Sequence, residues 1–352
     1  MFWPDPPAPW DFCRRSDMLA PNLDRVRISK TVTHPGDFLS VAREPNSERL
    51  WVGHTDFKIY TIDFAAAKPT ATAIFEGHNS YVSALRVIGG MLISASWDRK
   101  LMWWDIQNRR QVRTVEAHEL WIRQLAINTA QTLLATASDD MTCKLWDAQS
   151  GRLVRQLGGF EERLPRYDYP NKLFACAFSP DGRHIAATDE ACRVLVWETE
   201  SGRETARFDA MGFFKADWDR NNHPYGGIRC MAFSPDGRSL ALAGMENTDV
   251  AIINGKAMVQ IFDWQTRQKN YELKLGSNIQ FECLASHPQA EWLLAAPGAG
   301  GAGALYFLNS AQPRVIKETP ATMQTFAMTV NEASDAFYTV GRGKALRWEI
   351  PA

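Results

Sequence analysis

Several features that define common functional classes are missing from this sequence. Its six cysteines include no C-x-x-C pair, which excludes zinc-ribbon and thioredoxin-like motifs. No run of Lys or Arg is longer than a pair and the formal net charge is −1, whereas nucleic-acid binders usually carry a basic face. No segment approaches the roughly 18 apolar residues of a membrane span, and the opening MFWPDPPAPWDF lacks the basic start and apolar stretch of a signal peptide.

These absences narrow the expected partners and compartment. We expect no nucleic-acid partner and no membrane association. The histidines do not cluster at metal-ligand spacing, so we expect no metal and no cofactor. Most cysteines fall in strand-like segments, where a free thiol behaves as a small buried hydrophobe, and we expect reduced thiols in a cytoplasmic protein. The cysteines are Cys13, Cys143, Cys176, Cys192, Cys230 and Cys283.

What the sequence does contain is a repeat of about 40 residues marked by short motifs. His78 and His118 are 40 residues apart, and Trp104 and Trp146 are 42 apart, which matches one four-stranded propeller blade. Alternating apolar and polar residues between the markers predict strands, and no segment predicts a convincing helix. The markers are Gly77-His78 and Ala117-His118; Trp104-Asp105, Trp146-Asp147, Trp197-Glu198 and Trp348-Glu349; and Ser-Pro-Asp-Gly at 179–182 and 234–237.

These motifs resemble those of the WD40-repeat family. The cleanest copies run from His118 through SDDMTCKLWD (138–147) and from His78 through SWDRKLMWWD (96–105). The resemblance extends from about residue 24 to 350 and implies an all-β fold, a seven-bladed β-propeller of four-stranded antiparallel blades. It is nearly silent on function, because such folds host many unrelated roles. The inner strands are expected to start near Phe38, Val82, Ile122, Leu173, Ile228, Phe281 and Thr325.

The last blade is one strand short in sequence. Residues 24–33, DRVRISKTVT, precede the first blade and alternate like a strand. The resemblance implies that such a segment completes the last blade from the other end of the chain, which hides an open edge. We therefore expect an N-terminal extension at 1–23 and a single propeller domain at 24–352, closed by this N-terminal strand.

One repeat contains the residue types of a hydrolase triad, in His118, Ser138 and Asp140. The resemblance implies instead a structural network in which Trp146 donates its indole N–H through Ser138 to His118 and Asp140. We favour that interpretation and expect no catalytic residue, because the pattern recurs in the preceding repeat and an active site is rarely built twice. The preceding copy is His78, Ser96, Asp98 and Trp104.

Long connections and aromatic residues predict where a partner binds. The resemblance places the loops that enter each inner strand on one rim, the top face. Tyr, Trp and Arg are enriched in binding hot spots, and long loops in compact domains are usually functional. The expected partner-binding residues there are Tyr81, Trp97, Trp121, Arg123, Asp139, Phe213, Phe214, Trp218 and Tyr225. The long insertions are 159–172, 209–227 and 245–258, beside the GAGGAG turn at 298–303.

The leading hypothesis is a non-catalytic protein-interaction scaffold that holds a peptide or partner domain on the top face, as a monomeric propeller or a subunit of a hetero-complex. The GAGGAG run precedes strand-like ALYFLN rather than a helix, which argues against a dinucleotide site. The alternative is a small-ligand-binding or enzymatic propeller with a site in the channel mouth under the insertions of blades four to six. Its acid–base candidates are Asp168, Asp217, Asp219, Arg220 and His223.

Overall fold

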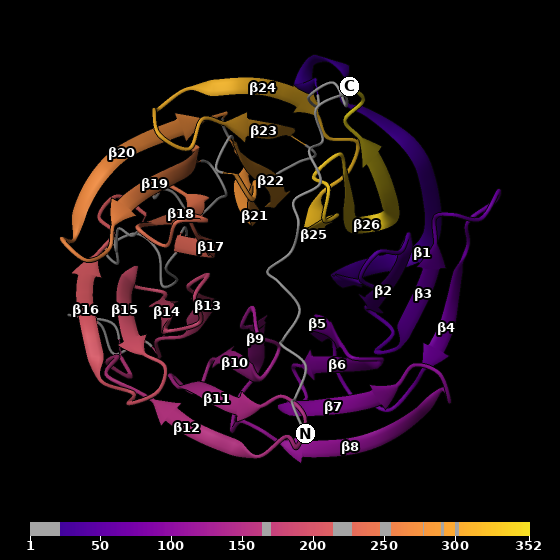
Figure 1. The fold of residues 1–352 in the computed structure, drawn as a ribbon, viewed down its shortest axis with the longest axis horizontal. Coiled ribbons are helices and arrows are strands. Elements are labelled where there is room, and N and C mark those ends of the chain that lie inside the picture. Colours follow the sequence, from indigo (N-terminus) through magenta and orange to yellow (C-terminus); the bar gives the residue numbers. More distant parts are fainter. Residues whose placement is uncertain are drawn as a thin grey trace, which may run out of the picture.

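The chain folds into a ring of antiparallel β-sheets around a central channel, seen in a computed structural model (Figure 1). The expectation of an all-β propeller is confirmed. The only helix among the described residues is a single 3-10 turn, η1, at Leu23–Arg25. The structure describes residues 22–163, 170–213, 227–246, 255–276, 278–289, 292–299 and 303–352.

Five sheets have four strands each. In each sheet the chain runs from an inner strand at the channel to an outer strand at the rim (Figure 1). Six of the seven expected inner-strand starts are confirmed to within a residue, whereas Phe38 lies inside the long strand β1 (Arg27–Arg43). The strands of the first two sheets are β5 (Val82–Ile88), β6 (Met91–Ser96), β7 (Lys100–Asp105) and β8 (Arg110–Glu116), then β9 (Ile122–Ile127), β10 (Leu133–Ser138), β11 (Cys143–Asp147) and β12 (Leu153–Leu157). Those of the next three are β13 (Leu173–Phe178), β14 (His184–Asp189), β15 (Arg193–Glu198) and β16 (Glu204–Asp209); β17 (Gly227–Phe233), β18 (Ser239–Met245), β19 (Ala257–Asp263) and β20 (Gln268–Leu275); and β21 (Gln280–Ser286), β22 (Leu293–Ala299), β23 (Ala304–Leu308) and β24 (Val315–Pro320).

The sixth sheet has six strands in the order β25-β26-β1-β2-β3-β4. The expectation of seven separate blades is therefore not met by the sheets of the described chain, which number six. The physical reason is that β1 runs without a break from its pairing with β26 into its pairing with β2. The strands are β25 (Thr325–Val330), β26 (Ala336–Glu349), β1 (Arg27–Arg43), β2 (Arg49–His54), β3 (Ile59–Asp63) and β4 (Ala71–Phe75).

Strand β26 reverses its direction within its own length. Its residues 337–341 pair with β25, whereas residues 342–349 pair with β1. Gly343 at the reversal has φ of 66°, which glycine adopts without strain. The two halves lie alongside each other. The backbone N–H of Ile350 donates to the carbonyl of Asp335 at 2.7 Å, and the rings of Phe337 and Trp348 stack with centroids 5.4 Å apart. The expected closure by the N-terminal strand is thus confirmed, with residues 27–33 as the outermost segment.

The apolar core lies between neighbouring sheets rather than within any one of them. Middle strands are covered on both faces, so they are buried almost throughout, as in LLATAS of β10. Outer strands such as β8 cover the core on one face only, and five of the seven residues of β8 are exposed. Between β2, β4 and β7, the rings of Trp51, Phe75 and Trp104 form a continuous stack with centroids 5.4 and 5.0 Å apart. Stacking the sheets around the channel therefore buries all their inner faces.

A polar clamp fastens the segment where the two ends of the chain meet. Glu48, in the turn between β1 and β2, accepts hydrogen bonds from the Tyr338 hydroxyl at 2.7 Å and from Arg347 Nε at 2.7 Å. Burial alone raises the pKa of Glu48, but the hydrogen bonds from Arg347 and Tyr338 bring it below its ordinary value. Nearby, the backbone N–H of Asn22 donates to Pro351 at 2.8 Å. The clamp therefore ties β26 to the turn that follows β1.

Removing the closing segment should open the ring. Deleting residues 1–33 exposes the unpaired edge of β26, and exposed edges template aggregation. We expect the melting temperature to fall by roughly 10 °C or more, with oligomers visible by light scattering. Deletion of residues 1–21 alone is the matched control and should leave both unchanged. A monomeric 1–33 deletion with the melting temperature of the full chain would contradict the closure.

Candidate protein-interaction surface

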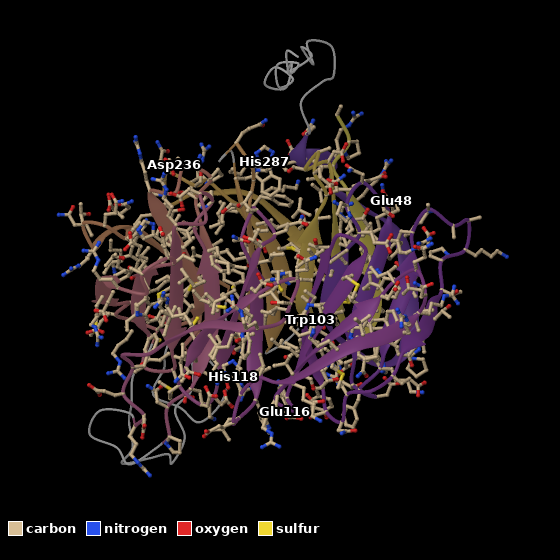
Figure 2. All side chains as sticks on the ribbon, turned by 60° about the horizontal axis from the view of Figure 1, so that its bottom comes forward. Glu48, Trp103, Glu116, His118, Asp236 and His287 are labelled. Carbon is tan, nitrogen blue, oxygen red and sulfur yellow. The ribbon has the colours of Figure 1, made fainter. Side chains whose placement is uncertain are left out.

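The ring has two faces that differ in their side chains. Figure 2 shows His118 and Glu116 at one end of the ring and Glu48, Asp236 and His287 at the opposite end. The first end carries the connections that enter each inner strand and those between second and third strands, and we call it the top face. The Ser-Pro-Asp-Gly turns at 179–182 and 234–237 lie at the other end, the bottom face.

Two polar networks reach from the top face into the core, and each differs in one residue from the expectation. His118 Nδ1 contacts Asp140 at 2.8 Å and Nε2 contacts Thr136 Oγ1 at 2.6 Å, and Trp146 donates its indole N–H to the same hydroxyl at 2.9 Å. The linking hydroxyl is therefore Thr136, and the expectation of Ser138 was wrong. Ser138 instead accepts the backbone N–H of Asp140 at 3.2 Å.

The preceding repeat makes the same arrangement. Ser94, not Ser96, receives the indole N–H of Trp104 at 2.8 Å and contacts His78 Nε2 at 2.7 Å. The hydroxyl and imidazole groups of both networks are buried, so no substrate reaches them. A nucleophile must be exposed to attack, whereas these groups satisfy one another and join strands. The networks are structural supports for the top face.

The exposed feature on the top face is a line of aromatic rings. Phe57, Tyr81, Trp97 and Trp121 follow one another with ring centroids 5.6, 5.0 and 4.4 Å apart. The last two indoles are parallel to within 3°, and Trp121 remains 44% exposed. Backbone hydrogen bonds fix the loops that carry them, since the N–H of Trp97 donates to Tyr81 at 3.0 Å and that of Asp139 to Trp121 at 3.0 Å. The structure thus brings together the residues that sequence selected in the second and third repeats. We call this line the aromatic ladder.

An arginine extends the aromatic ladder toward the channel. The Arg123 guanidinium lies 5.1 Å from the Trp97 ring and 5.0 Å from the Trp121 ring, within range of a cation–π contact. Two hydrogen bonds of 2.7 Å to the Asp139 carboxylate hold it in place. Because Arg pairs with a carboxylate through a planar fork, this arrangement is pre-organised. Arg123 and Asp139 therefore lie where expected, joined to each other.

The channel below is lined by residues that bulge from the inner strands. At each inner strand one residue is skipped in the pairing with the next strand, and bulges of this kind re-aim a side chain. All of the skipped residues line one cavity of about 420 Å³ in the channel. We call them the bulge ring: Leu39, Ser83, Arg123, Phe174, Arg229, Glu282 and Phe326. The sequence signal for the ring, one residue after each expected strand start, was present but not recognised.

The residues expected in the long insertions fare differently. Phe213 is fully buried among the apolar side chains between two sheets, so its expected exposure was wrong. Phe214, Trp218 and Tyr225 lie outside the described residues, as do Asp168, Asp217, Asp219, Arg220 and His223. Exposed Phe57, Leu120 and Met211 also lie on the top face and were missed, because exposure of a single apolar residue has no sequence signature. None of the described residues forms a cluster of His, Cys, Asp and Glu suited to a metal.

Comparisons with known proteins agree with this architecture. A family model described as WD domain, G-beta repeat matches residues 67–105, 109–147, 166–198 and 219–252. Eukaryotic translation initiation factor 3 subunit I of Bombyx mori is 28% identical over 146 residues, 41% of this chain and 41% of that protein. Pre-mRNA-processing factor 17 of Homo sapiens is 28% identical over 144 residues, 39% of this chain and 23% of that protein. Small ribosomal subunit protein RACK1y of Oryza sativa subsp. japonica is 27% identical over 130 residues, 36% and 35% of the two chains.

The repeated motifs, the ring of antiparallel sheets and the family model define the class of protein. The chain carries WD repeats and folds as an all-β propeller. Its matches cover less than half the length of each of these relatives. No helix among the described residues is long and apolar enough to cross a membrane.

The networks make a testable contribution to stability. Asp140→Ala leaves His118 buried without its partner, and we expect the free energy of unfolding at pH 7 to fall by about 1–3 kcal/mol in denaturant titrations. Asp24→Ala is the control, because that carboxylate is 83% exposed and should change stability by less than about 0.5 kcal/mol. If Asp140→Ala unfolded like the parent yet lost a hydrolytic activity, the structural interpretation would be wrong.

The same network predicts a pH dependence. Burial lowers the pKa of His118 below its ordinary value. Burial by itself raises the pKa of Asp140, but the hydrogen bond with His118 and those from neighbouring groups lower it overall. Both pKa values are lower in the folded chain than in the unfolded chain. At a pH above the unfolded-state pKa values both groups therefore contribute fully to stability, and they lose that contribution as the pH falls. The stability difference between the parent and Asp140→Ala should therefore shrink below about pH 4, measured by denaturant titration at several pH values.

Proposed function

We propose that this protein is a non-catalytic interaction scaffold that binds a peptide or a partner domain on its top face. The observation that carries the proposal is the half-exposed Trp121, stacked 4.4 Å from Trp97 and flanked by the fixed Arg123 guanidinium. Tryptophan and arginine are the residue types that dominate binding hot spots. Their fixed geometry lowers the entropy lost on binding, because few torsions remain to be frozen.

The proposed surface has a defined centre and border. The aromatic ladder with Arg123 and Asp139 forms the centre, and exposed Phe57 and Leu120 extend it along the top face. Of the expected residues of the insertion wall, we leave out Phe213, which is buried. Phe214, Trp218 and Tyr225 stay in the proposal on their sequence position alone. A partner that covers this surface would bury aromatic rings around the Arg123–Asp139 ion pair.

The names of the relatives support a role within an assembly. One is a subunit of a translation initiation factor, and another is a protein of the small ribosomal subunit. We propose that this chain likewise works through protein contacts, as a lone propeller or as a subunit of a hetero-complex. We place it in the cytoplasm, because the five cysteines of the described chain are free thiols and disulfides are rare there.

The alternative, a small-ligand or enzymatic site in the channel mouth, would need convergent acid–base groups. Burial raises the pKa of both Glu190 and Glu282, a property typical of catalytic carboxylates. Only Glu282 lines the channel cavity, however, while Glu190 is buried beside it. A single carboxylate supports binding better than acid–base catalysis, which favours the scaffold.

We also infer that the six-stranded sheet acts as two blades of a single domain at 24–352, giving seven in all. One apolar cluster joins Tyr338 and Val340 of β26 to Val52 and Ile62 of β2 and β3. The ring of Phe64 lies 5.7 Å from that of Tyr338. Strands that pack face to face belong to two layers, even though β1 connects them by hydrogen bonds.

The proposal predicts a selective loss of partner capture. We expect the full chain, used as bait in a cell extract, to retain proteins that Trp121→Ala and Trp97→Ala do not. With the purified partner, calorimetry should show each substitution weakening binding by about 2 kcal/mol. For Trp121→Ala the melting temperature should change little, because the exposed ring contributes little to the core.

The matched control is Leu153→Ala on the outer strand β12. Leu153 is also 44% exposed but lies on the rim of the ring, away from the top face. It should bind every partner as the parent does. Unchanged affinity of the folded Trp97→Ala/Trp121→Ala double variant, with loss on substitution of the Ser-Pro-Asp-Gly turns, would place the site on the bottom face.

A further inference from the structure

The bulge ring is strongly uneven in charge. Three neighbouring members of the ring, Phe174, Arg229 and Glu282, come from the inner strands β13, β17 and β21, and Arg123 precedes them on β9. The other members are Leu39, Ser83 and Phe326, which carry no charge. All the charge of the ring therefore lies on one side of the channel, beside the aromatic ladder.

Two arginines of the ring share one aromatic partner. The Arg229 guanidinium lies 4.0 Å from the centroid of the Phe174 ring, and that of Arg123 lies 5.6 Å from the same centroid. The charge of Arg123 is neutralised by Asp139, whose carboxylate accepts hydrogen bonds from Arg123 Nε and Nη2. Arg229 forms no ion pair with a described residue, and its buried Nε has no hydrogen-bond partner. The ring thus contains a cation with unused hydrogen-bonding capacity.

A third arginine enters the same cavity from below. Arg86 of β5 lines the channel, and the corresponding positions of the other inner strands carry only small side chains. It donates to its neighbour's carbonyl, Leu85, at 2.7 Å and pairs with no carboxylate among the described residues. Burial lowers the pKa of Arg86. The small side chains that share its level are Ala42, Ala126, Ala177, Ala232, Ala285 and Thr329.

The cavity is short of negative charge. Among the described residues, Glu282 is the only carboxylate in its lining, which also contains Arg86, Arg123 and Arg229. Burial raises the pKa of Glu282, although Arg229 and Arg123 oppose that rise. Behind the ring, Glu190 and Lys172 add one charge of each sign. Because Asp139 already pairs with Arg123, two guanidinium groups of the described lining, those of Arg86 and Arg229, face one carboxylate, that of Glu282.

We propose that the channel mouth is a binding socket for one anionic group, a carboxylate or a phosphate, presented by the partner that covers the top face. This inference rests on the proposed function and adds the chemistry of the partner. The anion lies between Arg229 and Arg86, where it accepts charge-assisted hydrogen bonds. Such a group also offsets the repulsion between guanidinium groups that burial strengthens. A chain segment reaching the socket crosses the aromatic ladder on the way.

The socket can be tested without knowing the partner. Inorganic phosphate and glutarate are titrated against the full chain at constant ionic strength, set with sodium chloride, and the dissociation constants are taken from the rise in melting temperature. We expect both anions, or one of them, to stabilise the protein beyond chloride. Protection by glutarate indicates an acidic side chain or carboxyl terminus as the natural group, and protection by phosphate alone indicates a phosphorylated partner.

Variants then locate the effect. Arg229→Gln and Arg86→Gln should each weaken anion binding roughly tenfold, as expected for loss of a hydrogen bond to a charged group. Arg229→Lys keeps the charge and should retain most of the affinity. The control is Arg238→Gln on the bottom face, whose side chain is 84% exposed and which should bind like the parent.

Three outcomes would overturn the socket: no protection beyond chloride, equal protection of Arg229→Gln and parent, or protection by the dication putrescine instead. Failure here is separable from failure of the proposed function. Trp121→Ala should lose the partner yet keep the anion effect, because the indole lies outside the channel lining. Loss of partner binding in Trp121→Ala together with a chloride-like response to both anions would refute the socket and leave the scaffold standing.

Discussion

Strand β1 is the element on which the rest of the molecule depends. Its first part hydrogen-bonds to the last strand of the chain and its second part to β2, so one continuous backbone crosses the point where the ring is joined. The ring of sheets stays closed only while that join holds. The clamp of Glu48 with Tyr338 and Arg347 lies at the same place and resists its opening.

The top face combines rigid support with exposed chemistry. The buried networks around His78 and His118 hold the turns from below, and the aromatic ladder lies directly on those turns. Residues adjacent in sequence therefore have opposite roles, as Asp140 points inward to His118 while Asp139 holds Arg123 at the surface. This alternation lets a well-packed fold present aromatic and charged side chains without giving up buried contacts.

Much of this could be predicted from sequence, because turn residues and strand alternation are local signals. Six of the seven inner-strand starts, the N-terminal closure and the position of Arg123 and Asp139 on the top face all followed from repeat spacing. Local signals fail where two positions look alike. Thr136 and Ser138 are two residues apart on one strand and face the same way, so sequence could not say which hydroxyl links His118 to Trp146. Phe213 was misplaced because composition does not distinguish a buried ring from an exposed one.

The bulge ring has a consequence for how such a protein can diversify. A bulged residue is skipped in the strand pairing, so its side chain is freed from the register that constrains its neighbours. One position per inner strand can then vary in charge and size while the surrounding sheets keep their core. Leu39, Arg123 and Glu282 already occupy equivalent places with very different chemistry. A few independent substitutions in the bulge ring can therefore change the chemistry of the channel while the fold stays the same.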